Sequence, residues 1–94
     1  MIRGFADRET ERIWNGAGSR QLPSDLNRRA LAKLRLLDAA ERIDDLRIPP
    51  GNHLEKLQGG RREQYSIRIN AQWRICFTWT EGNADDVEIV DYHR

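Results

Sequence analysis

Arg68 and Arg74 are permanently charged side chains that lie in two segments of alternating polarity, each flanked by large apolar residues. Side chains along a strand alternate between two faces. The pattern therefore predicts a hairpin with one apolar face and one face that carries both arginines. A guanidinium held on a rigid sheet binds two phosphate oxygens and stabilises the charge that develops on them. For Arg74 the alternative is a structural ion pair with an acid such as Asp91.

Near its end the sequence reads Asp91-Tyr92-His93, three side chains that can hold or transfer a proton. His93 titrates near neutrality, which suits a proton donor or acceptor. Tyr92 can donate a proton, position a phosphate or stack on an exposed base, and Asp91 can orient a neighbour or act as a base. The structural alternatives are an idle terminal residue for His93 and an aromatic cover over the core for Tyr92. For Asp91 the alternative is an ion pair with Arg68 or Arg74.

Charge is distributed unevenly along the chain, although its net value is only +1. Residues 56–76 hold one acid, Glu63, and five bases: Lys56, Arg61, Arg62, Arg68 and Arg74. Residues 81–91 hold five acids and no base. Such asymmetry favours a local face that binds a polyanion, with cross-strand ion pairing between the two segments as the alternative.

The elements that position these residues follow from apolar periodicity. Residues 2–6 predict a short strand, and Asp7 is suited to cap a helix over residues 9–14. Ser24 is expected to cap a second helix, whose apolar stripe recurs at intervals of three and four: Leu26, Ala30, Leu34 and Leu37. After the turn at residues 49–52, strands are expected within 53–60, 63–70, 73–79 and 87–93. This order predicts one α+β domain over residues 1–94, with the helices packed on one side of the sheet.

Composition excludes several classes of protein. A charged fraction of 33% with clear apolar periodicity describes a soluble folded domain. No apolar run is long enough to cross a bilayer, and the first residues lack the apolar core of a signal peptide, so a cytoplasmic protein without membrane contact is expected. The single cysteine, Cys76, allows no internal disulfide, and with two histidines in the chain neither a metal site nor a cofactor is expected.

Four segments together resemble the HigB toxins of bacterial toxin–antitoxin modules, which belong to the RelE-like superfamily. These segments are Leu57-Gln58-Gly59, Tyr65-Ser66-Ile67-Arg68-Ile69-Asn70, Gln72-Trp73-Arg74-Ile75-Cys76-Phe77 and the terminal Asp91-Tyr92-His93. The resemblance covers essentially the whole chain. It implies an α+β, RelE-like fold in which an N-terminal strand and two helices pack on a mainly antiparallel sheet of about four to five strands.

The resemblance also implies a ribosome-dependent endoribonuclease. Such an enzyme cuts messenger RNA in the decoding site of the 30S subunit without a metal and is held inactive by a HigA-like helix-turn-helix antitoxin. The family's cleft arginine falls on Arg74, and its terminal acid, tyrosine and histidine fall on Asp91, Tyr92 and His93. Where the family commonly has lysine, this chain has Gln58.

Metal-free RNA cleavage needs a base for the 2′-hydroxyl, a cation for the phosphorane and an acid for the leaving 5′-oxygen. Arg74 is expected to supply the cation, and Asp91, Tyr92 and His93 the proton-transferring groups. Substrate binding is expected from residues beside the cleft and a Gly-Gly tip: Lys56, Gln58, Arg61, Arg62 and Arg68. Glu55 is a candidate base beside a cation, although an ion pair with Lys56 or Arg62 is the simpler account. His53 is expected to lie exposed in its loop.

Two alternatives use the same fold without RNA cleavage. One is a binding module similar to the gyrase poisons of the superfamily, which act through protein contacts. The other is a degenerate toxin that still binds antitoxin and ribosome, an interpretation motivated by Gln58.

Overall fold

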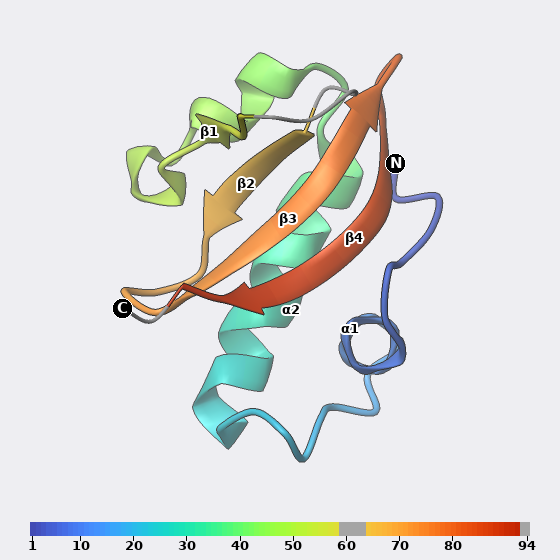
Figure 1. The fold of residues 1–94 in the computed structure, drawn as a ribbon, viewed down its shortest axis with the longest axis vertical. Coiled ribbons are helices and arrows are strands. Elements are labelled where there is room, and N and C mark those ends of the chain that lie inside the picture. Colours follow the sequence, from blue (N-terminus) through green and yellow to red (C-terminus); the bar gives the residue numbers. More distant parts are fainter. Residues whose placement is uncertain (59–63, 93–94) are drawn as a thin grey trace.

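A computed structural model of the chain describes residues 1–58 and 64–92. Along the chain, two α-helices and two short 3₁₀ helices precede a four-stranded sheet (Figure 1). The helical elements are α1 (Arg8–Trp14), α2 (Ser24–Ala39), η1 (Ile43–Arg47) and η2 (Pro50–Asn52). The strands are β1 (Glu55–Lys56), β2 (Gln64–Arg68), β3 (Trp73–Thr80) and β4 (Asn83–Asp91).

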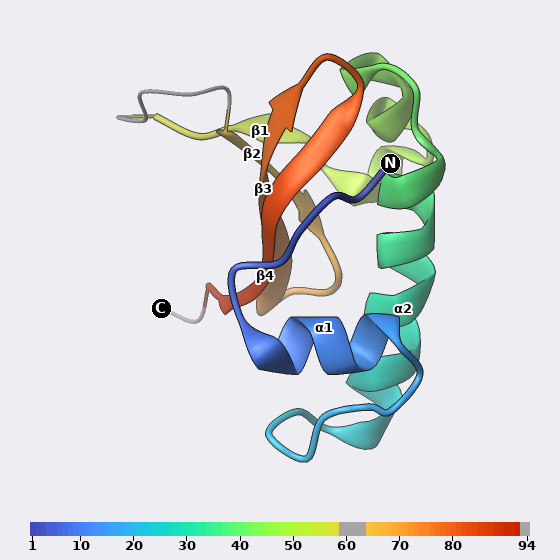
Figure 2. The same cartoon turned by 90° about the vertical axis from the view of Figure 1, so that its right-hand side faces the viewer.

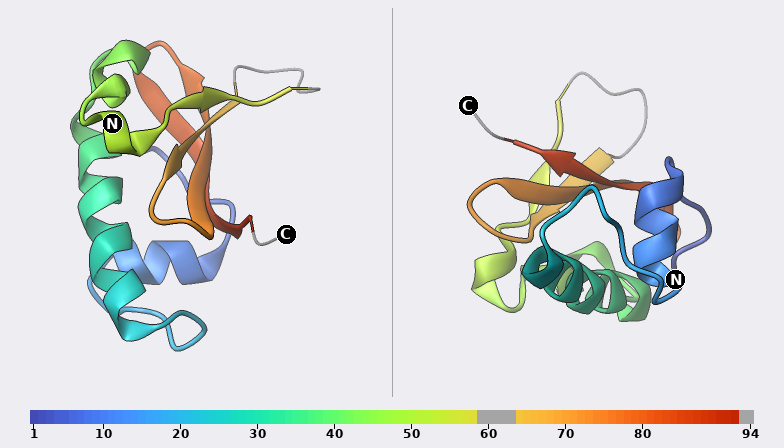
Figure 3. Two further views of the ribbon diagram at one scale, coloured as in Figure 1. Left: turned by 90° about the vertical axis from the view of Figure 1, so that its left-hand side faces the viewer. Right: turned by 90° about the horizontal axis from the view of Figure 1, so that it is seen from below.

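The sheet is an antiparallel meander in the order β1-β2-β3-β4. Both α-helices lie on one side of it, as Figures 2 and 3 show from opposite directions. The α+β architecture with helices on one side of a mainly antiparallel sheet is therefore confirmed. We call the other side, which neither α-helix covers and which carries Ser66, Arg74 and Cys76, the open face.

Local chemistry explains where the helices begin. The side chain of Asp7 accepts a hydrogen bond from the backbone N–H of Thr10, which confirms the predicted cap of α1. The predicted cap of α2 is wrong by one residue. Pro23 occupies the N-cap position without a side-chain hydrogen bond, and Ser24 is already helical. Proline suits this boundary because its fixed φ permits the turn into the helix, and its missing N–H is not needed there.

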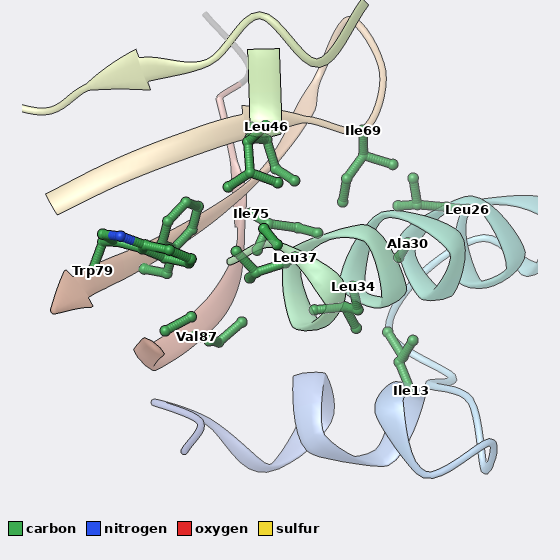
Figure 4. Packing of buried hydrophobic residues seen from close by; sticks show 14 residues of the cluster. Ile13, Leu26, Ala30, Leu34, Leu37, Leu46, Ile69, Ile75, Trp79 and Val87 are labelled. Atoms are coloured by element: carbon green, nitrogen blue, oxygen red, sulfur yellow. The ribbon is translucent and has the colours of Figure 1, made fainter. Parts of the chain in front are cut away.

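The core fills the space between α2 and the sheet. The stripe of α2 predicted from periodicity is buried in full: Leu26, Ala30, Leu34 and Leu37. It meets Ile75 of β3, Val87 of β4 and Ile69, which directly follows β2 (Figure 4). Ile13 of α1 closes one end of this core, and Leu46 of η1 closes the other.

The N-terminal segment lies beside β4 without forming a full strand. Ile2 and Phe5 make isolated parallel bridges to Ala84 and Val87. The final strand also begins earlier than the sequence indicated, at Asn83, because it pairs with β3 from Thr80 onward across the turn at residues 81–82. None of the helices within the described residues has the length and apolar character that a membrane span requires.

Candidate active site

The open face gathers polar side chains from all four strands. Residues paired in register across antiparallel strands point to the same side of a sheet. One such row runs from Glu55 through Ser66 and Cys76 to Glu88. A second row places Arg68 opposite Arg74, and Arg74 opposite Val90. The face predicted to carry both arginines therefore has the expected register.

Arg74 is buried at the centre of this face, with only 8% of its surface exposed. Its Nε donates to Ser66 Oγ at 2.8 Å, and Nη2 donates to the backbone carbonyl oxygens of His53 and Ser66. The guanidinium is thus fixed mostly by neutral oxygen atoms, which leave its charge largely uncompensated. A charge-assisted network of this kind holds the group in one orientation.

Nη1 of Arg74 points toward a carboxylate. It lies 3.9 Å from Glu55 Oε1, which is at the outer limit of an ion pair. The Glu55 side chain is 58% exposed, so water weakens this attraction. Glu55 therefore stands beside the fixed cation without being locked to it, and it is accessible to a substrate.

Tyr92 lies against the guanidinium of Arg74. The centre of its ring lies 5.8 Å from Arg74 Cζ, and its hydroxyl lies 3.7 Å from Cys76 Sγ. Its backbone N–H donates to Gln72, which continues the pairing of β4 with β3 beyond Asp91. Burial, reinforced by the contact with Cys76, raises the pKa of the Tyr92 phenol above its ordinary value of 10.0. The phenol consequently keeps its proton at neutral pH.

Cys76 is half-buried beneath this ring. Burial raises the pKa of its thiol above the ordinary 9.0, and the hydrogen bond from Tyr92 opposes that shift. A thiol whose pKa is raised is a poor nucleophile at neutral pH, because the thiolate is the reactive form. Cys76 is therefore suited to packing.

A cavity of about 400 Å³ opens beside Tyr92 on the same face. Its lining includes Cys76, Thr78 and Gln64 from the central strands and Asp86 and Glu88 from β4. Leu57 and Val90 add apolar surface, so the cavity offers polar groups, apolar groups and one aromatic wall, a combination that suits an unstacked base. The cavity therefore extends the site beyond the arginine.

Asp91 and Tyr92 do not share a side of the sheet. Asp91 is the register partner of Trp73, whose side chain packs against the core, and its carboxylate accepts a 3.1 Å hydrogen bond from the Gln72 amide. Neighbouring residues in a strand point in opposite directions. The structure thus brings Tyr92 to Arg74. It places Asp91 on the other side of the sheet from Arg74, the residue with which an ion pair was considered.

The remaining sequence candidates lie around this centre or beyond the described part. Lys56 and Gln58 are exposed on and just after β1, and Arg68 is half-buried at the end of β2. His53, expected to be exposed, is exposed, and it adopts a left-handed backbone with φ of 44°. The predictions for Arg61, Arg62 and His93, and for the Gly59-Gly60 tip, concern residues outside those that the structure describes.

Two contributors were not identified from the sequence. In the sequence Ser66 is one of several polar residues that alternate with apolar ones, yet its hydroxyl accepts a hydrogen bond from Arg74. The carbonyl of His53 contributes through backbone geometry, for which residue type gives no signal. Within residues 1–58 and 64–92, no three His, Cys, Asp or Glu side chains are arranged to bind a metal ion.

Comparison with known proteins matches this chain to a family. The model of the HigB-like toxin family, described as the RelE-like toxin of type II toxin–antitoxin system HigB, matches residues 3–93. Toxin HigB-1 of Vibrio cholerae is 41% identical over 85 residues, covering 89% of this chain and 90% of that protein. Endoribonuclease HigB of Proteus vulgaris is 28% identical over 93 residues, covering 99% of this chain and 100% of that protein.

Proposed function

The chain belongs to the HigB-like family of RelE-like toxins from type II toxin–antitoxin systems, and we propose that it is an endoribonuclease that cleaves messenger RNA on the ribosome. Its antitoxin is a HigA-like helix-turn-helix protein, and its target lies in the decoding site of the 30S subunit in the cytoplasm. The name of the Proteus vulgaris relative, Endoribonuclease HigB, supports the reaction class.

The observation that carries the proposal is the fixation of Arg74. The guanidinium is held before substrate arrives by Ser66 and the His53 carbonyl, while Nη1 faces the accessible side. A preorganised cation needs no rearrangement when negative charge develops on phosphate oxygens, so it stabilises the transition state more than the ground state. Arg74 is therefore assigned to the phosphorane.

The proton transfers are assigned to groups on either side of this cation. A base removes the proton of the 2′-hydroxyl, the O2′–P bond forms and the P–O5′ bond breaks. The leaving 5′-oxygen takes a proton from an acid. The products are a 2′,3′-cyclic phosphate and a 5′-hydroxyl end. Glu55 lies beside Nη1 of Arg74, and the ring of the protonated Tyr92 lies against its Cζ, so both groups flank the cation that would hold the phosphate.

His93 and Asp91 complete the assignment. Glu55 is our choice for the base and Tyr92 for the acid, and His93 is proposed to exchange protons with the same reacting atoms. Asp91 orients the end of β4 through its hydrogen bond with Gln72. Lys56, Gln58, Arg61, Arg62 and Arg68 are proposed to contact the RNA backbone, which positions a substrate without reading its sequence.

Induction of the chain in cells tests the proposal. Mapping of messenger RNA ends should reveal new 5′-hydroxyl termini within translated regions, and co-expression of the adjacent antitoxin reading frame should remove them. Arg74→Ala should abolish the cuts. Translation that continues unchanged, together with loss of DNA supercoiling, would instead support the non-catalytic module of the same fold.

Gln58 motivates one further candidate function, a degenerate toxin that binds antitoxin and ribosome without cutting. Its side chain is exposed and uncharged where the family commonly has lysine. Under this hypothesis Gln58→Lys creates cleavage that the unaltered chain lacks. If both chains produce the same cuts, the degenerate interpretation is excluded.

A further inference from the structure

A second basic site lies between α2 and the hairpin that joins β2 to β3. The groove has a volume of about 650 Å³, and its lining includes three cationic residues, Arg29, Lys33 and Arg68. We propose that this groove binds the phosphate backbone of RNA, as a contact surface additional to the Arg74 site. The inference goes beyond cleavage, since it requires only that the protein binds RNA.

Two of the cations are anchored by neutral oxygen atoms. Arg29 Nη2 donates to the backbone carbonyl of Ile69 at 3.0 Å, and Lys33 Nζ donates to the side-chain oxygen of Asn52. Asn52 is fully buried and donates to the carbonyls of Leu46 and Ile48, which fixes its position. The charged groups are therefore held in place at the groove without being neutralised there.

The charge balance of the groove favours an anion. Arg29 and Lys33 are one turn apart on α2, so both project toward the same side of the helix. None of the residues that line the groove within the described chain is a carboxylate, and Asp91 is bonded to Gln72 at its rim. Burial and the repulsion from Arg29 lower the pKa of the Lys33 ammonium. A bound phosphate would offset both effects.

The other lining residues favour RNA over an acidic protein segment. The rim adds the side-chain amides of Asn70 and Gln72 and the small residues Gly51 and Ala71. Protein partners are usually anchored by aromatic or large aliphatic side chains in apolar pockets. The one large apolar residue in this lining, Ile69, is turned into the core and only 2% exposed. Cations and amides without an apolar anchor match a phosphate backbone.

Arg68 links the two sites. It lines the groove and is also the cross-strand partner of Arg74. An RNA strand whose scissile phosphate meets Arg74 therefore passes next to Arg68, and a neighbouring RNA segment can occupy the groove. The sequence predicted that Arg68 binds substrate. In the groove, Arg29 and Lys33 of α2 line the same surface as Arg68.

Binding of an RNA oligonucleotide with 2′-O-methyl groups tests the inference, because this probe has no 2′-hydroxyl and cannot be cleaved. Lys33→Gln removes the charge but keeps an N–H donor for Asn52. It should weaken binding about three- to tenfold at low salt, and it should reduce the slope of log K against log salt by about 0.7. Arg68→Gln should act in the same direction.

Arg35→Gln is the matched control, since Arg35 is exposed on the same helix and does not line the groove. If Lys33→Gln and Arg35→Gln bind the probe equally well, the inference is overturned. It is also overturned if Lys33→Gln leaves RNA binding intact and weakens only binding of the antitoxin, which identifies a protein site. Because the probe measures binding alone, failure of the cleavage proposal leaves this result interpretable.

Discussion

Arg74 Nε donates a 2.8 Å hydrogen bond to Ser66 Oγ, joining two buried side chains across β2 and β3. Ser66→Ala removes the acceptor and leaves a buried charged donor without it. We expect a loss of about 1.5–3 kcal/mol in the free energy of unfolding, measured by urea denaturation. We also expect RNA cleavage to slow by up to about 100-fold, because a displaced guanidinium no longer meets the phosphate.

Thr80→Ala is the control for Ser66, since Thr80 is exposed at the end of β3. It should change stability by no more than about 0.5 kcal/mol. Equal stabilities of the two variants would show that the buried hydrogen bond does not fix Arg74.

Replacing the arginine itself tests its shape as well as its charge. Arg74→Lys retains a positive charge but cannot reproduce the planar fork that reaches Ser66, His53 and the phosphate together. Cleavage should fall by about 10²–10³-fold, as when one oriented transition-state donor is lost. Arg68→Lys should have a smaller effect on the rate of RNA cleavage, because the contact of Arg68 with the RNA backbone needs charge alone. The assignment fails if the two variants are equally active.

Glu55→Gln tests the assigned base. The amide is close in size but cannot accept the 2′-hydroxyl proton, so the cleavage rate should fall by about 10²–10⁴-fold. Glu81→Gln changes an exposed glutamate in the β3–β4 turn and should leave the cleavage rate unchanged. A Glu55→Gln variant that cleaves as fast as the unaltered chain would contradict the assignment.

The contact between Tyr92 and Cys76 predicts slow alkylation of the thiol. Because burial raises the thiol pKa above 9.0, less than half of it is thiolate at that pH, and the rate with iodoacetamide should still be increasing there. Tyr92→Ala uncovers the sulfur, so alkylation should become faster. Cys76 is the single cysteine, so labelling reports on this site alone. Identical profiles with and without the tyrosine would show that its ring does not cover the thiol.

The interface between α2 and the sheet predicts unequal effects of two neighbouring leucines. Leu34 is completely buried, whereas Leu36 is 39% exposed. Leu34→Ala should reduce the free energy of unfolding by about 2–5 kcal/mol because it leaves a cavity between helix and sheet. Leu36→Ala should change it by about 0.5 kcal/mol or less. Thermal or urea unfolding measures both, and similar losses would mean that the helix is rotated relative to the sheet.

The spacing of apolar residues predicted most of the fold, because each helix or strand buries one of its sides and carries its apolar residues there. The α2 stripe is buried as expected, and the register of β2 with β3 places Arg68 opposite Arg74. The boundaries were less accurate. Ser24 satisfies the residue preference of an N-cap, but the preceding Pro23 takes that position.

The sequence predicted which face of the sheet carries Arg74, but not the contacts that hold Arg74 in place. Alternation placed Arg74 on the open face, whereas its burial depends on the chain at His53 reaching over it with a carbonyl oxygen. No residue type encodes that contact. Asp91 is a different case, because strand alternation alone places it on the opposite side of the sheet from its neighbour Tyr92. The spacing of Arg29 and Lys33 on α2 gives no sign that they meet Arg68, because only the folded hairpin brings the three together.

The N-terminal segment has a consequence for solubility. An outermost strand with unpaired backbone groups is a template for self-association. Along β4 the segment occupies these groups: Arg3 and Ala6 donate to Ala84 and Val87, and the N–H groups of Ala84 and Val87 are bonded in return. Thr10 of α1 then accepts from Ile89 through its hydroxyl. Removing residues 1–6 would therefore leave backbone groups of β4 unpaired at the edge of the sheet and would promote aggregation.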